Sequence, residues 1–198
     1  MSRRPTASAS QEVRIIGGRW KRTPLPVAQV EGLRPTPGRV RETLFNWLGQ
    51  DLTGLRCLDV FAGTGALGLE AASRGAVEVV LVEQDAALVR SLAGLASKLR
   101  ADTVRVERGD GVSALRQRRG QAWDLVLLDP PFGGDGNPTL FSAALEAASE
   151  AIHPDGEIYL EAPVVWTDAD LAPFGLQVHR CGKAGMVAFH LLRPIGAG

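Results

Sequence analysis

The residues of this sequence best suited to chemistry are four in a row, Asp129-Pro130-Pro131-Phe132, directly after the apolar run 125–128. They fit a reaction at the amino group of a nucleobase, whose nitrogen is a poor nucleophile because its lone pair is delocalised into the ring. The Asp129 carboxylate and the Pro130 carbonyl can accept the amino hydrogens and free that lone pair. Phe132 offers a face for stacking the base. The tetrapeptide predicts transfer of a group to a planar amine, with Asp129, Pro130 and Phe132 as catalytic residues.

A glycine-rich turn earlier in the chain is suited to hold the donor of that group. Gly63, Gly65 and Gly68 follow a predicted strand and open a predicted helix. Glycine there lets the backbone turn tightly and lets a cofactor approach closely. Glu83 ends the next predicted strand, and its carboxylate can accept hydrogen bonds from both ribose hydroxyls of an adenosine. By itself this pattern fits either a dinucleotide or S-adenosylmethionine.

Two acidic residues near the turn bear on which nucleoside is bound. Asp59 precedes the glycines, where a carboxylate suits the α-amino group of a methionine moiety and would repel a pyrophosphate; the alternative is that it caps the loop backbone. Asp110 can accept a hydrogen bond from an adenine amino group or cap the helix expected from about residue 112, and it can do both. Asp59 therefore favours S-adenosylmethionine as the donor, which makes the transferred group a methyl.

These residues need a fold that brings the ends of several strands together. Nearly continuous Val/Leu runs predict strands buried on both faces, and they alternate with helical segments, as in a parallel sheet with helices on both faces. In the tail, the runs 175–181 and 186–192 flank Gly182-Lys183-Ala184-Gly185 and predict an antiparallel edge hairpin. The strands are expected at 56–60, 77–82, 103–107, 124–128 and 157–161, and the helices at 67–74, 86–99, 112–118 and 139–152.

The first fifty residues are expected to form an extension to this sheet. Residues 1–12 are polar and basic and predict a disordered tail. Short extended pieces around Gly17-Gly18 predict a small β-hairpin. A proline-rich loop follows, and then a helix over 39–48. We therefore expect residues 13–50 to be an N-terminal extension and 51–198 to be the cofactor-binding domain. The predicted buried stripe of the helix consists of Val40, Leu44, Trp47 and Leu48.

The net charge of zero hides a basic end on an acidic body. Residues 1–50 hold nine Lys or Arg and three acids, a charge of +6, and the remaining residues carry −6. Such an end suits contact with a polyphosphate, and the alternative is that it is merely solvated. Charge alone leaves both open.

The composition also bounds the class of protein. A length of 198 residues suits one domain. No apolar run approaches the length needed to span a bilayer, and the N-terminus lacks the apolar stretch of a secretion signal, so we expect a cytoplasmic protein. The two cysteines have no metal-ligand spacing and predict neither a disulfide nor a metal site. Cys57 lies in an apolar run and is expected to be buried.

The glycine-rich and Asp-Pro-Pro-Phe motifs resemble those of the class I methyltransferases. Four segments are more closely similar to one family, the RsmD family: Arg14-Ile15-Ile16-Gly17-Gly18, Leu33-Arg34-Pro35-Thr36, 39–48 and 61–71. The likeness extends over about residues 13–192. It implies a Rossmann-like α/β fold with a mostly parallel seven-stranded sheet. It also implies methylation, with S-adenosylmethionine, of N2 of one guanine in the 16S ribosomal RNA of the small subunit.

The resemblance further implies roles for individual residues. The loop at Arg34-Pro35-Thr36 is expected to close over the cofactor, Asp129 and Phe132 to hold the guanine, and the basic hairpin to grip RNA. The expected cofactor-binding residues are Asp59, Phe61, Gly63, Gly65, Glu83, Asp110, Gly111, Arg34 and Thr36. The expected RNA-binding residues are Arg14, Arg19, Lys21, Arg22 and Arg39.

Other functions share part of this chemistry. A DNA methyltransferase acting on adenine N6 or cytosine N4 would use the same tetrapeptide, but such enzymes usually carry a further domain to select and flip the base, for which this chain has no room. Methylation of a glutamine side-chain amide does not explain the basic end. An NAD-dependent dehydrogenase would not need Asp59 or the Asp129 motif. A non-catalytic RNA-binding protein leaves the chemical groups without a purpose. The residues themselves do not choose guanine N2 over adenine N6.

Overall fold

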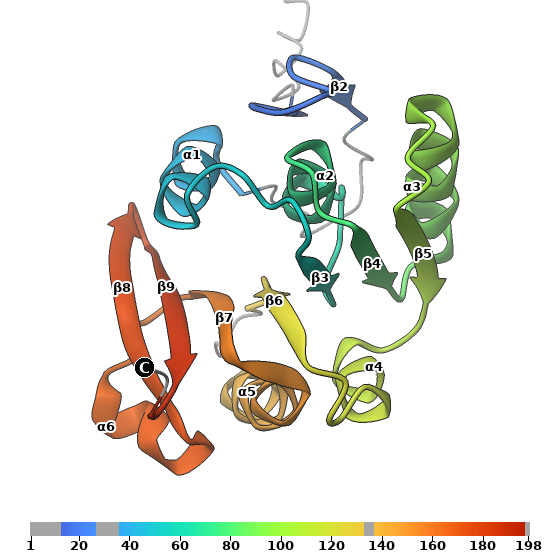
Figure 1. Cartoon of the computed structure of the whole chain (residues 1–198). Helices are drawn as coiled ribbons and strands as arrows, with labels where there is room; N and C mark the ends of the chain where they lie inside the picture. Colours follow the sequence, from blue (N-terminus) through green and yellow to red (C-terminus); the bar gives the residue numbers. More distant parts are fainter. Residues whose placement is uncertain (1–12, 27–35, 133–136, 197–198) are drawn as a thin grey trace, which may run out of the picture.

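Seven strands form one sheet in the order β5-β4-β3-β6-β7-β9-β8, and helices cover both of its faces (Figure 1). The computed structural model describes residues 13–26, 36–132 and 137–196. Neighbouring strands from β5 to β7 pair in parallel, whereas β9 is antiparallel to both β7 and β8. The predicted sheet, with its antiparallel C-terminal edge, is confirmed. The strands are β3 (Arg56–Asp59), β4 (Glu78–Glu83), β5 (Val104–Arg108), β6 (Trp123–Leu128), β7 (Ile152–Ala162), β8 (Leu176–Ala184) and β9 (Val187–Pro194).

The helices lie in two layers, with α1, α2 and α3 on one face of the sheet and α4, α5 and α6 on the other (Figure 1). Each layer encloses its own hydrophobic core, so the central strands are buried on both sides. Cys57 is buried in the first core, as expected. The helices are α1 (Gly38–Trp47), α2 (Ala66–Ser73), α3 (Ala86–Leu99), α4 (Gly111–Gln117), α5 (Pro138–Ala151) and α6 (Asp168–Leu171), the last followed by a 3₁₀ turn (Ala172–Phe174).

Helix α6 was not predicted. It is only four residues long, too short for a periodic apolar pattern, and it begins with a capping box in which Thr167 and Asp170 exchange hydrogen bonds. Helix α3, by contrast, has the predicted bounds, and Asp85 caps its first turn by accepting hydrogen bonds from the N–H groups of Ala87 and Leu88.

The order of the strands reverses between β3 and β6. From β3 the chain proceeds outward to β4 and β5, and then returns to the other side of β3 to form β6 and β7. Ligands of open α/β sheets bind beyond the carboxyl ends of the strands at such a reversal. Asp59 is the last residue of β3 and Asp129 directly follows β6, so both lie at this point.

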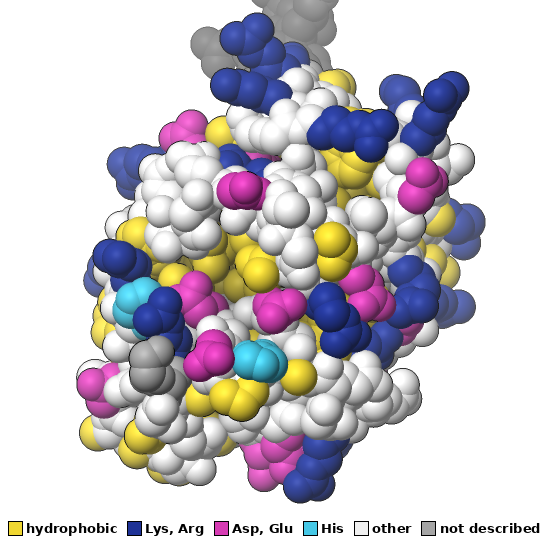
Figure 2. All heavy atoms as spheres, in the orientation of Figure 1, with side chains coloured by type: hydrophobic (Ala, Val, Ile, Leu, Met, Phe, Trp, Pro, Cys, Tyr) yellow, Lys and Arg dark blue, Asp and Glu magenta, His cyan; other side chains and the backbone are white. Residues whose placement is uncertain are grey.

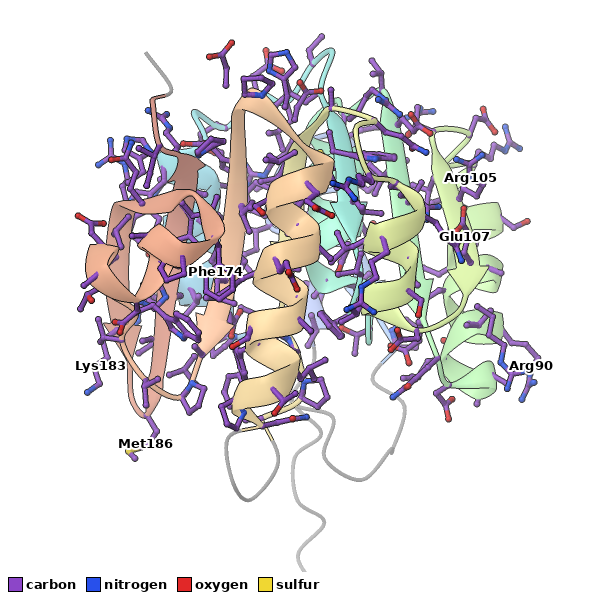
Figure 3. The ribbon with its side chains drawn as sticks, turned by 90° about the horizontal axis from the view of Figure 1, so that it is seen from below. Arg90, Arg105, Glu107, Phe174, Lys183 and Met186 are labelled. Atoms are coloured by element: carbon purple, nitrogen blue, oxygen red, sulfur yellow. The ribbon has the colours of Figure 1, made fainter. Side chains whose placement is uncertain are left out.

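The two edges of the sheet differ from its centre. Strand β5 carries exposed charged side chains, and Arg105 Nε forms an ion pair of 3.2 Å with Glu107 Oε1 on the same strand (Figure 3). At the other edge, strands β8 and β9 pair as far as Ala184 and Val187. The hairpin turn is therefore Gly185-Met186 and not the whole of 182–185. Gly182 pairs with Phe189 within β8, and a Cβ at Gly182 would lie 2.3 Å from the Phe189 ring.

The predicted N-terminal hairpin is present as β1 (Val13–Arg14) and β2 (Pro24–Leu25), and it packs on α2. Gly18 has φ +69°, and a Cβ there would lie 1.8 Å from the carbonyl oxygen of Ser73, so only glycine fits this approach. In α1 the expected Val40 and Leu44 are buried, and so are Arg41 and Phe45, whereas Trp47 and Leu48 are half-buried. The expected disordered tail, 1–12, lies outside the described residues.

Candidate active site

Four carboxylates lie at or beside the carboxyl ends of four neighbouring strands. Glu83 ends β4, Asp59 ends β3, Asp129 follows β6, and Glu161 lies next to the last residue of β7. Sequence reasoning selected the first three and missed Glu161. The predicted strand 157–161 ended at this residue, so the strand-end rule applied to Asp129 would also have selected Glu161. The sheet thus brings the predicted donor site and the predicted acceptor site together.

The glycines of the first turn are required by its geometry. Gly63 and Gly65 have φ of +53° and +77°, a region that favours glycine. Gly68 lies in α2 against β4, where a Cβ would lie 2.2 Å from Leu81 Cδ2. The turn therefore bends sharply twice and then packs its helix closely against the sheet.

Asp59 is buried beneath this turn with only part of its hydrogen-bonding capacity used. Its Oδ2 accepts a hydrogen bond of 3.0 Å from the N–H of Gly68. Its Oδ1 is buried and accepts no hydrogen bond from the described residues. Burial raises the pKa of Asp59 to about 7, although the N–H groups of Gly68 and Phe61 favour the charged form. Asp59 does hold the backbone, as the alternative role required, and its second oxygen suits a cationic ligand such as an α-ammonium group.

Glu83 is fixed by backbone groups at the end of β4. Its Oε2 accepts a hydrogen bond of 3.0 Å from the N–H of Gly63, and its Oε1 accepts one of 2.8 Å from the N–H of Asp85. Each oxygen keeps a further lone pair. The carboxylate is therefore pre-oriented beside the glycine turn, as recognition of two ribose hydroxyls requires.

Asp110 caps helix α4, since its Oδ1 accepts a hydrogen bond of 2.8 Å from the N–H of Ser113. The expected cap is confirmed, and its contact with an adenine stays a prediction. The neighbouring Gly111 is buried, and a Cβ there would lie 2.4 Å from the carbonyl oxygen of Val60 and 3.0 Å from the ring of Phe61. Phe61 and Gly111 thus form one wall between the ends of β3 and β5.

The half-buried Asp129 and the buried Glu161 form an acidic pair. Asp129 Oδ2 accepts a hydrogen bond of 3.3 Å from the Thr36 hydroxyl, and Glu161 Oε1 accepts one of 2.9 Å from the Tyr159 hydroxyl. Burial raises the pKa of both carboxyls, and the charges of Glu161 and Asp59 raise that of Asp129 further. Burial and the charge of Glu161 also raise the pKa of the Tyr159 hydroxyl, which therefore stays a donor. Because their pKa values are raised, these carboxylates bind a proton more readily than exposed ones. Among the described residues, their hydrogen-bond donors are the Thr36 and Tyr159 hydroxyls.

Phe132 is half-buried at the edge of the second core. Its ring lies 6.0 Å from that of Phe141, centroid to centroid, in a tilted arrangement, and Phe141 in turn stacks near Trp166. Pro130 is buried and Pro131 is exposed. These contacts hold the Phe132 ring against the second core, three residues after Asp129 in the chain, and its stacking on a base stays a prediction.

A second buried carboxylate, Glu70 on α2, joins the extension to the sheet, and sequence reasoning gave it no role. Its oxygens accept hydrogen bonds from the N–H groups of Ile16 and Gly17 at 2.8 and 2.7 Å. They also pair with the guanidinium groups of Arg74 at 2.9 Å and Arg41 at 3.5 Å. A fully buried glutamate in an otherwise small and apolar helix was the available signal. We call these five residues the Glu70 clamp.

The Glu70 clamp reaches the active site through Arg41. The Nε of Arg41 donates a hydrogen bond of 3.3 Å to the carbonyl of Thr36, whose hydroxyl contacts Asp129. Of the predicted Arg34-Pro35-Thr36 loop, only Thr36 is among the described residues, and it is buried; Arg34 lies outside them. Thr36 therefore lies against the acceptor site.

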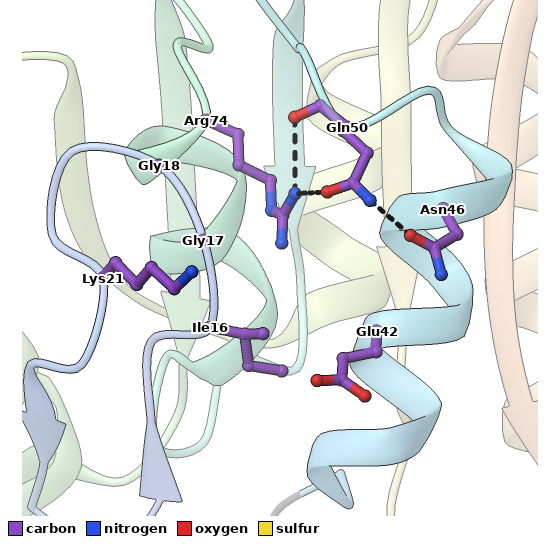
Figure 4. A pocket seen from close by; sticks show the side chains of 8 residues that line it. All are labelled: Ile16, Gly17, Gly18, Lys21, Glu42, Asn46, Gln50 and Arg74. Carbon is purple, nitrogen blue, oxygen red and sulfur yellow. Dashed lines mark hydrogen bonds between the residues drawn. The ribbon is translucent and has the colours of Figure 1, made fainter.

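A polar cleft of about 550 Å³ separates the hairpin from α1 (Figure 4). Across it, the Arg74 guanidinium donates to the backbone and side-chain oxygens of Gln50, which in turn donates to Asn46. The side chains of Lys21 and Glu42 lie on its opposite walls (Figure 4). The cleft belongs to the surface that carries the basic hairpin.

All five predicted RNA-binding side chains are exposed. They are Arg14, Arg19, Lys21, Arg22 and Arg39. Figure 2 shows Lys and Arg side chains gathered over the hairpin end of the molecule. The structure thus presents these cations to solvent while the backbone of the same hairpin is held against α2.

Comparison with known proteins places this arrangement among the methyltransferases. The Escherichia coli protein yhhF, which carries the name of a methyltransferase, superposes with a TM-score of 0.77 and 34% identity over 94% of this chain and 99% of that one. TrmN from Thermus thermophilus shares the fold, with a TM-score of 0.65 and 23% identity over 85% of this chain and 51% of that one.

The sequence comparisons name the family. A model described as Conserved hypothetical protein 95 matches residues 13–193. Ribosomal RNA small subunit methyltransferase D of Escherichia coli (strain K12) is 38% identical over 99% of this chain and 97% of its own length. The Haemophilus influenzae protein of the same name is 39% identical over 81% of this chain and 84% of its own length. The chain belongs to the family of ribosomal RNA small subunit methyltransferase D, and the predicted resemblance is confirmed.

Two further findings concern the described residues alone. No helix in the described ranges has both the length and the apolar character needed to cross a membrane. Within the same ranges, no group of three or more His, Cys, Asp or Glu side chains is arranged to hold a metal ion.

The family and fold imply a methyl donor of the S-adenosylmethionine type.

Proposed function

We propose that this protein transfers a methyl group from S-adenosylmethionine to N2 of a specific guanine in 16S ribosomal RNA. The observation that carries the proposal is the position of Asp129 at the strand reversal beside Asp59, close enough for the charge of Asp59 to raise the pKa of Asp129. A site for an amine and a site for a methionine moiety would thus adjoin at the carboxyl ends of the central strands β3 and β6. The family supports a small-subunit RNA as the substrate.

The first turn and its neighbours are suited to the methyl donor. The free oxygen of Asp59 would pair with the α-ammonium group, and Glu83 with the ribose hydroxyls. Gly63 and Gly65 allow close approach of the backbone, and Phe61 and Gly111 would line the adenine site, with Asp110 at its edge. Thr36, together with Arg34, would close the pocket. Bound there, S-adenosylmethionine supplies an electrophilic methyl group on sulfur.

The acceptor side of the site prepares the amine and removes its proton. Asp129 and the Pro130 carbonyl accept the amino hydrogens and turn the nitrogen lone pair out of the ring, and Phe132 holds the base by stacking. As the bond from nitrogen to methyl forms and the bond from methyl to sulfur breaks, one amino proton passes to the Asp129 carboxylate. Desolvation and the charges of Glu161 and Asp59 raise the pKa of Asp129, which makes it a stronger proton acceptor than an exposed carboxylate.

Residues 13–50 supply the grip on RNA in this proposal, and residues 51–198 supply the methyl-transfer site. The exposed cations of the hairpin and Arg39 would contact phosphates, which position an RNA without reading its bases. The substrate is then the 16S RNA of a small subunit or of an assembly intermediate, and the protein acts in the cytoplasm, where these particles are.

The test is to incubate the purified protein with labelled S-adenosylmethionine and unmodified small-subunit particles, and to identify the product nucleoside by mass spectrometry. N2-methylguanosine is the expected product, and N6-methyladenosine would contradict the proposal. Asp129→Ala should lower kcat by about 10³-fold, since it removes both an acceptor and the base, while S-adenosylmethionine binding stays nearly intact. Asp102→Ala, at an exposed acid before β5, is the matched control. Full activity of Asp129→Ala would show the mechanism to be wrong.

A further inference from the structure

The acceptor site contains two carboxylates where amine activation needs only one. Strands β6 and β7 pair in parallel with Leu128 opposite Leu160. Asp129 directly follows Leu128 and Glu161 directly follows Leu160, so the two residues continue this pairing side by side. Glu161 is only 4% exposed. The Asp129 mechanism leaves this second buried carboxylate without a purpose.

The pair is poorly supplied with donors for a buried site. In the described part of the chain, each carboxylate accepts a hydrogen bond from a single side-chain hydroxyl, that of Thr36 or Tyr159, and neither forms an ion pair. The Thr36 hydroxyl also lies close enough to Glu161 to favour its charged form, but it has only one hydrogen to share. The half-buried Asp129 and the buried Glu161 therefore keep acceptor capacity for a ligand.

The edges of the nucleobases differ in what they offer two adjacent acceptors. Guanine presents its N2 amino group beside a ring N1–H, which makes two donors in a row. Adenine and cytosine present their amino group beside a ring nitrogen that is an acceptor. An enzyme that acts on an extruded base reads this edge by hydrogen bonds. Two carboxylates therefore match guanine and oppose the other two bases.

The geometry points to Glu161 as a specificity-determining residue that accepts the N1–H of the target guanine while Asp129 accepts from its N2 amino group. This inference rests on the proposed function and explains how the site selects guanine N2. The Tyr159 hydroxyl holds Glu161 Oε1 at 2.9 Å, and the carboxylate has further lone pairs for a donor on the base.

The assignment requires both carboxyls to be ionised when the base is bound. In the free protein, burial raises the pKa of both carboxyls, and each would gain from a donor that favours its charged form. The guanine edge brings a donor to each carboxylate. An adenine edge would set the lone pair of its N1 against Glu161, which leaves two acceptors facing one another.

The experiment uses an analogue that keeps the amino group and lacks the N1–H. Small-subunit particles are assembled from RNA that carries either guanine or 2-aminopurine at the mapped target position, and kcat/KM is measured for both. The wild type should prefer guanine by on the order of 10²-fold or more, because a site built to bind a donor rejects an analogue without it. In Glu161→Gln the amide can donate to N1 of 2-aminopurine, so the preference should fall at least about tenfold.

Two further variants separate recognition from a merely structural role. Glu161→Asp keeps an acceptor and should retain the preference for guanine, even if its activity is lower. Tyr159→Phe removes the hydroxyl that holds Glu161 and should lower kcat/KM for both substrates with little change in their ratio. An unchanged guanine preference in Glu161→Gln overturns the inference.

The outcomes also separate this inference from the proposed function. If the wild type forms N2-methylguanosine and Glu161→Gln keeps the same ratio, the proposed function stands and Glu161 does not read the base. If the wild type forms another methylated nucleoside, the proposed function itself is wrong, and the inference falls with it.

Discussion

Two groups of buried or half-buried carboxylates lie on the same face of the sheet and differ in how many hydrogen-bond donors and cations they contact. Glu70 accepts two backbone N–H hydrogen bonds and pairs with two arginines. Asp129 and Glu161 each have one hydroxyl donor, and Asp59 has a buried oxygen with no donor from the described residues. The first carboxylate holds the chain together, and the others are left short of partners.

The number of partners distinguishes a structural carboxylate from a functional one. A buried charge costs free energy unless it is paired. The Glu70 clamp meets that requirement within the protein, so its value is stability and the placement of Thr36 through Arg41. The carboxylates of the active site are not paired in this way. They should therefore destabilise the protein without ligand, and ligand binding should remove part of that free-energy cost. Each half of this contrast can be tested by substitution.

The largest effect is expected from breaking the clamp. Glu70→Ala leaves two buried guanidinium groups without their carboxylate, and removal of one partner of a buried pair typically costs roughly 3–5 kcal/mol. We expect a loss of this size in the free energy of unfolding, measured by chemical denaturation.

The control for that variant is Glu78→Ala. Glu78 also pairs with two arginines, Arg56 at 2.8 Å and Arg105 at 3.1 Å, but it is a third exposed. Such pairs contribute about 0–1 kcal/mol. Equal losses for the two variants would show that burial of the clamp is not what gives it its value.

A smaller and opposite effect is expected at Asp59. Its pKa is about 7 in the folded protein against 3.8 for an ordinary aspartate, so the folded state holds a proton that the unfolded state has released between these values. Stability from this group is therefore present at low pH and is lost as pH rises from about 4 to about 7, by at most roughly 4 kcal/mol. Asp59→Asn removes this loss, so without ligand it should be more stable than the wild type at pH 8 and similar at pH 4.

Thermal and chemical unfolding across this pH range measure the difference. The same variant should bind S-adenosylmethionine more weakly, because the amide has no charge to pair with an ammonium group. A variant that is destabilised at pH 8 would show that Asp59 is a structural acid like Glu70.

The smallest effect per substituted residue is expected at the exposed cations of the N-terminal hairpin, whose backbone the Glu70 clamp holds. Replacing Arg19, Lys21 and Arg22 with Gln should leave unfolding nearly unchanged, since their side chains are exposed. RNA binding should weaken, and the slope of log affinity against log salt should flatten by about one for each phosphate that no longer has a cation beside it. The measurement is binding to small-subunit RNA at several salt concentrations.

The matched control removes the same charge elsewhere, from the exposed Lys98, Arg116 and Arg180. It should alter the slope much less, because those residues lie outside the extension. If both triple variants flatten the slope equally, the hairpin is not the site of RNA contact, and net charge alone explains the binding.

Much of the fold followed from local pattern. The order of the strands along the chain, the bounds of α3 and the antiparallel edge were predicted because buried parallel strands are continuous apolar runs and helices have their own period. Strand β7 begins at Ile152, five residues before the predicted start at 157. The parts that were wrong or missed have local causes. Helix α6 is too short to show a helical period of apolar residues. The turn of the edge hairpin differs from the predicted one because Gly182 pairs with Phe189 and remains in β8.

Local sequence was enough to select residues that could do chemistry. Asp59, Glu83 and Asp129 each lie at or directly after the end of an apolar strand, and a carboxylate at a strand end is a local feature. Which of these carboxylates find hydrogen-bond donors and cations depends on contacts between distant parts of the chain. Glu70 finds its donors more than fifty residues away, at Ile16 and Gly17. Glu161 meets Asp129 through the register of β6 and β7. Those partners are set by long-range packing, and no local pattern contains them.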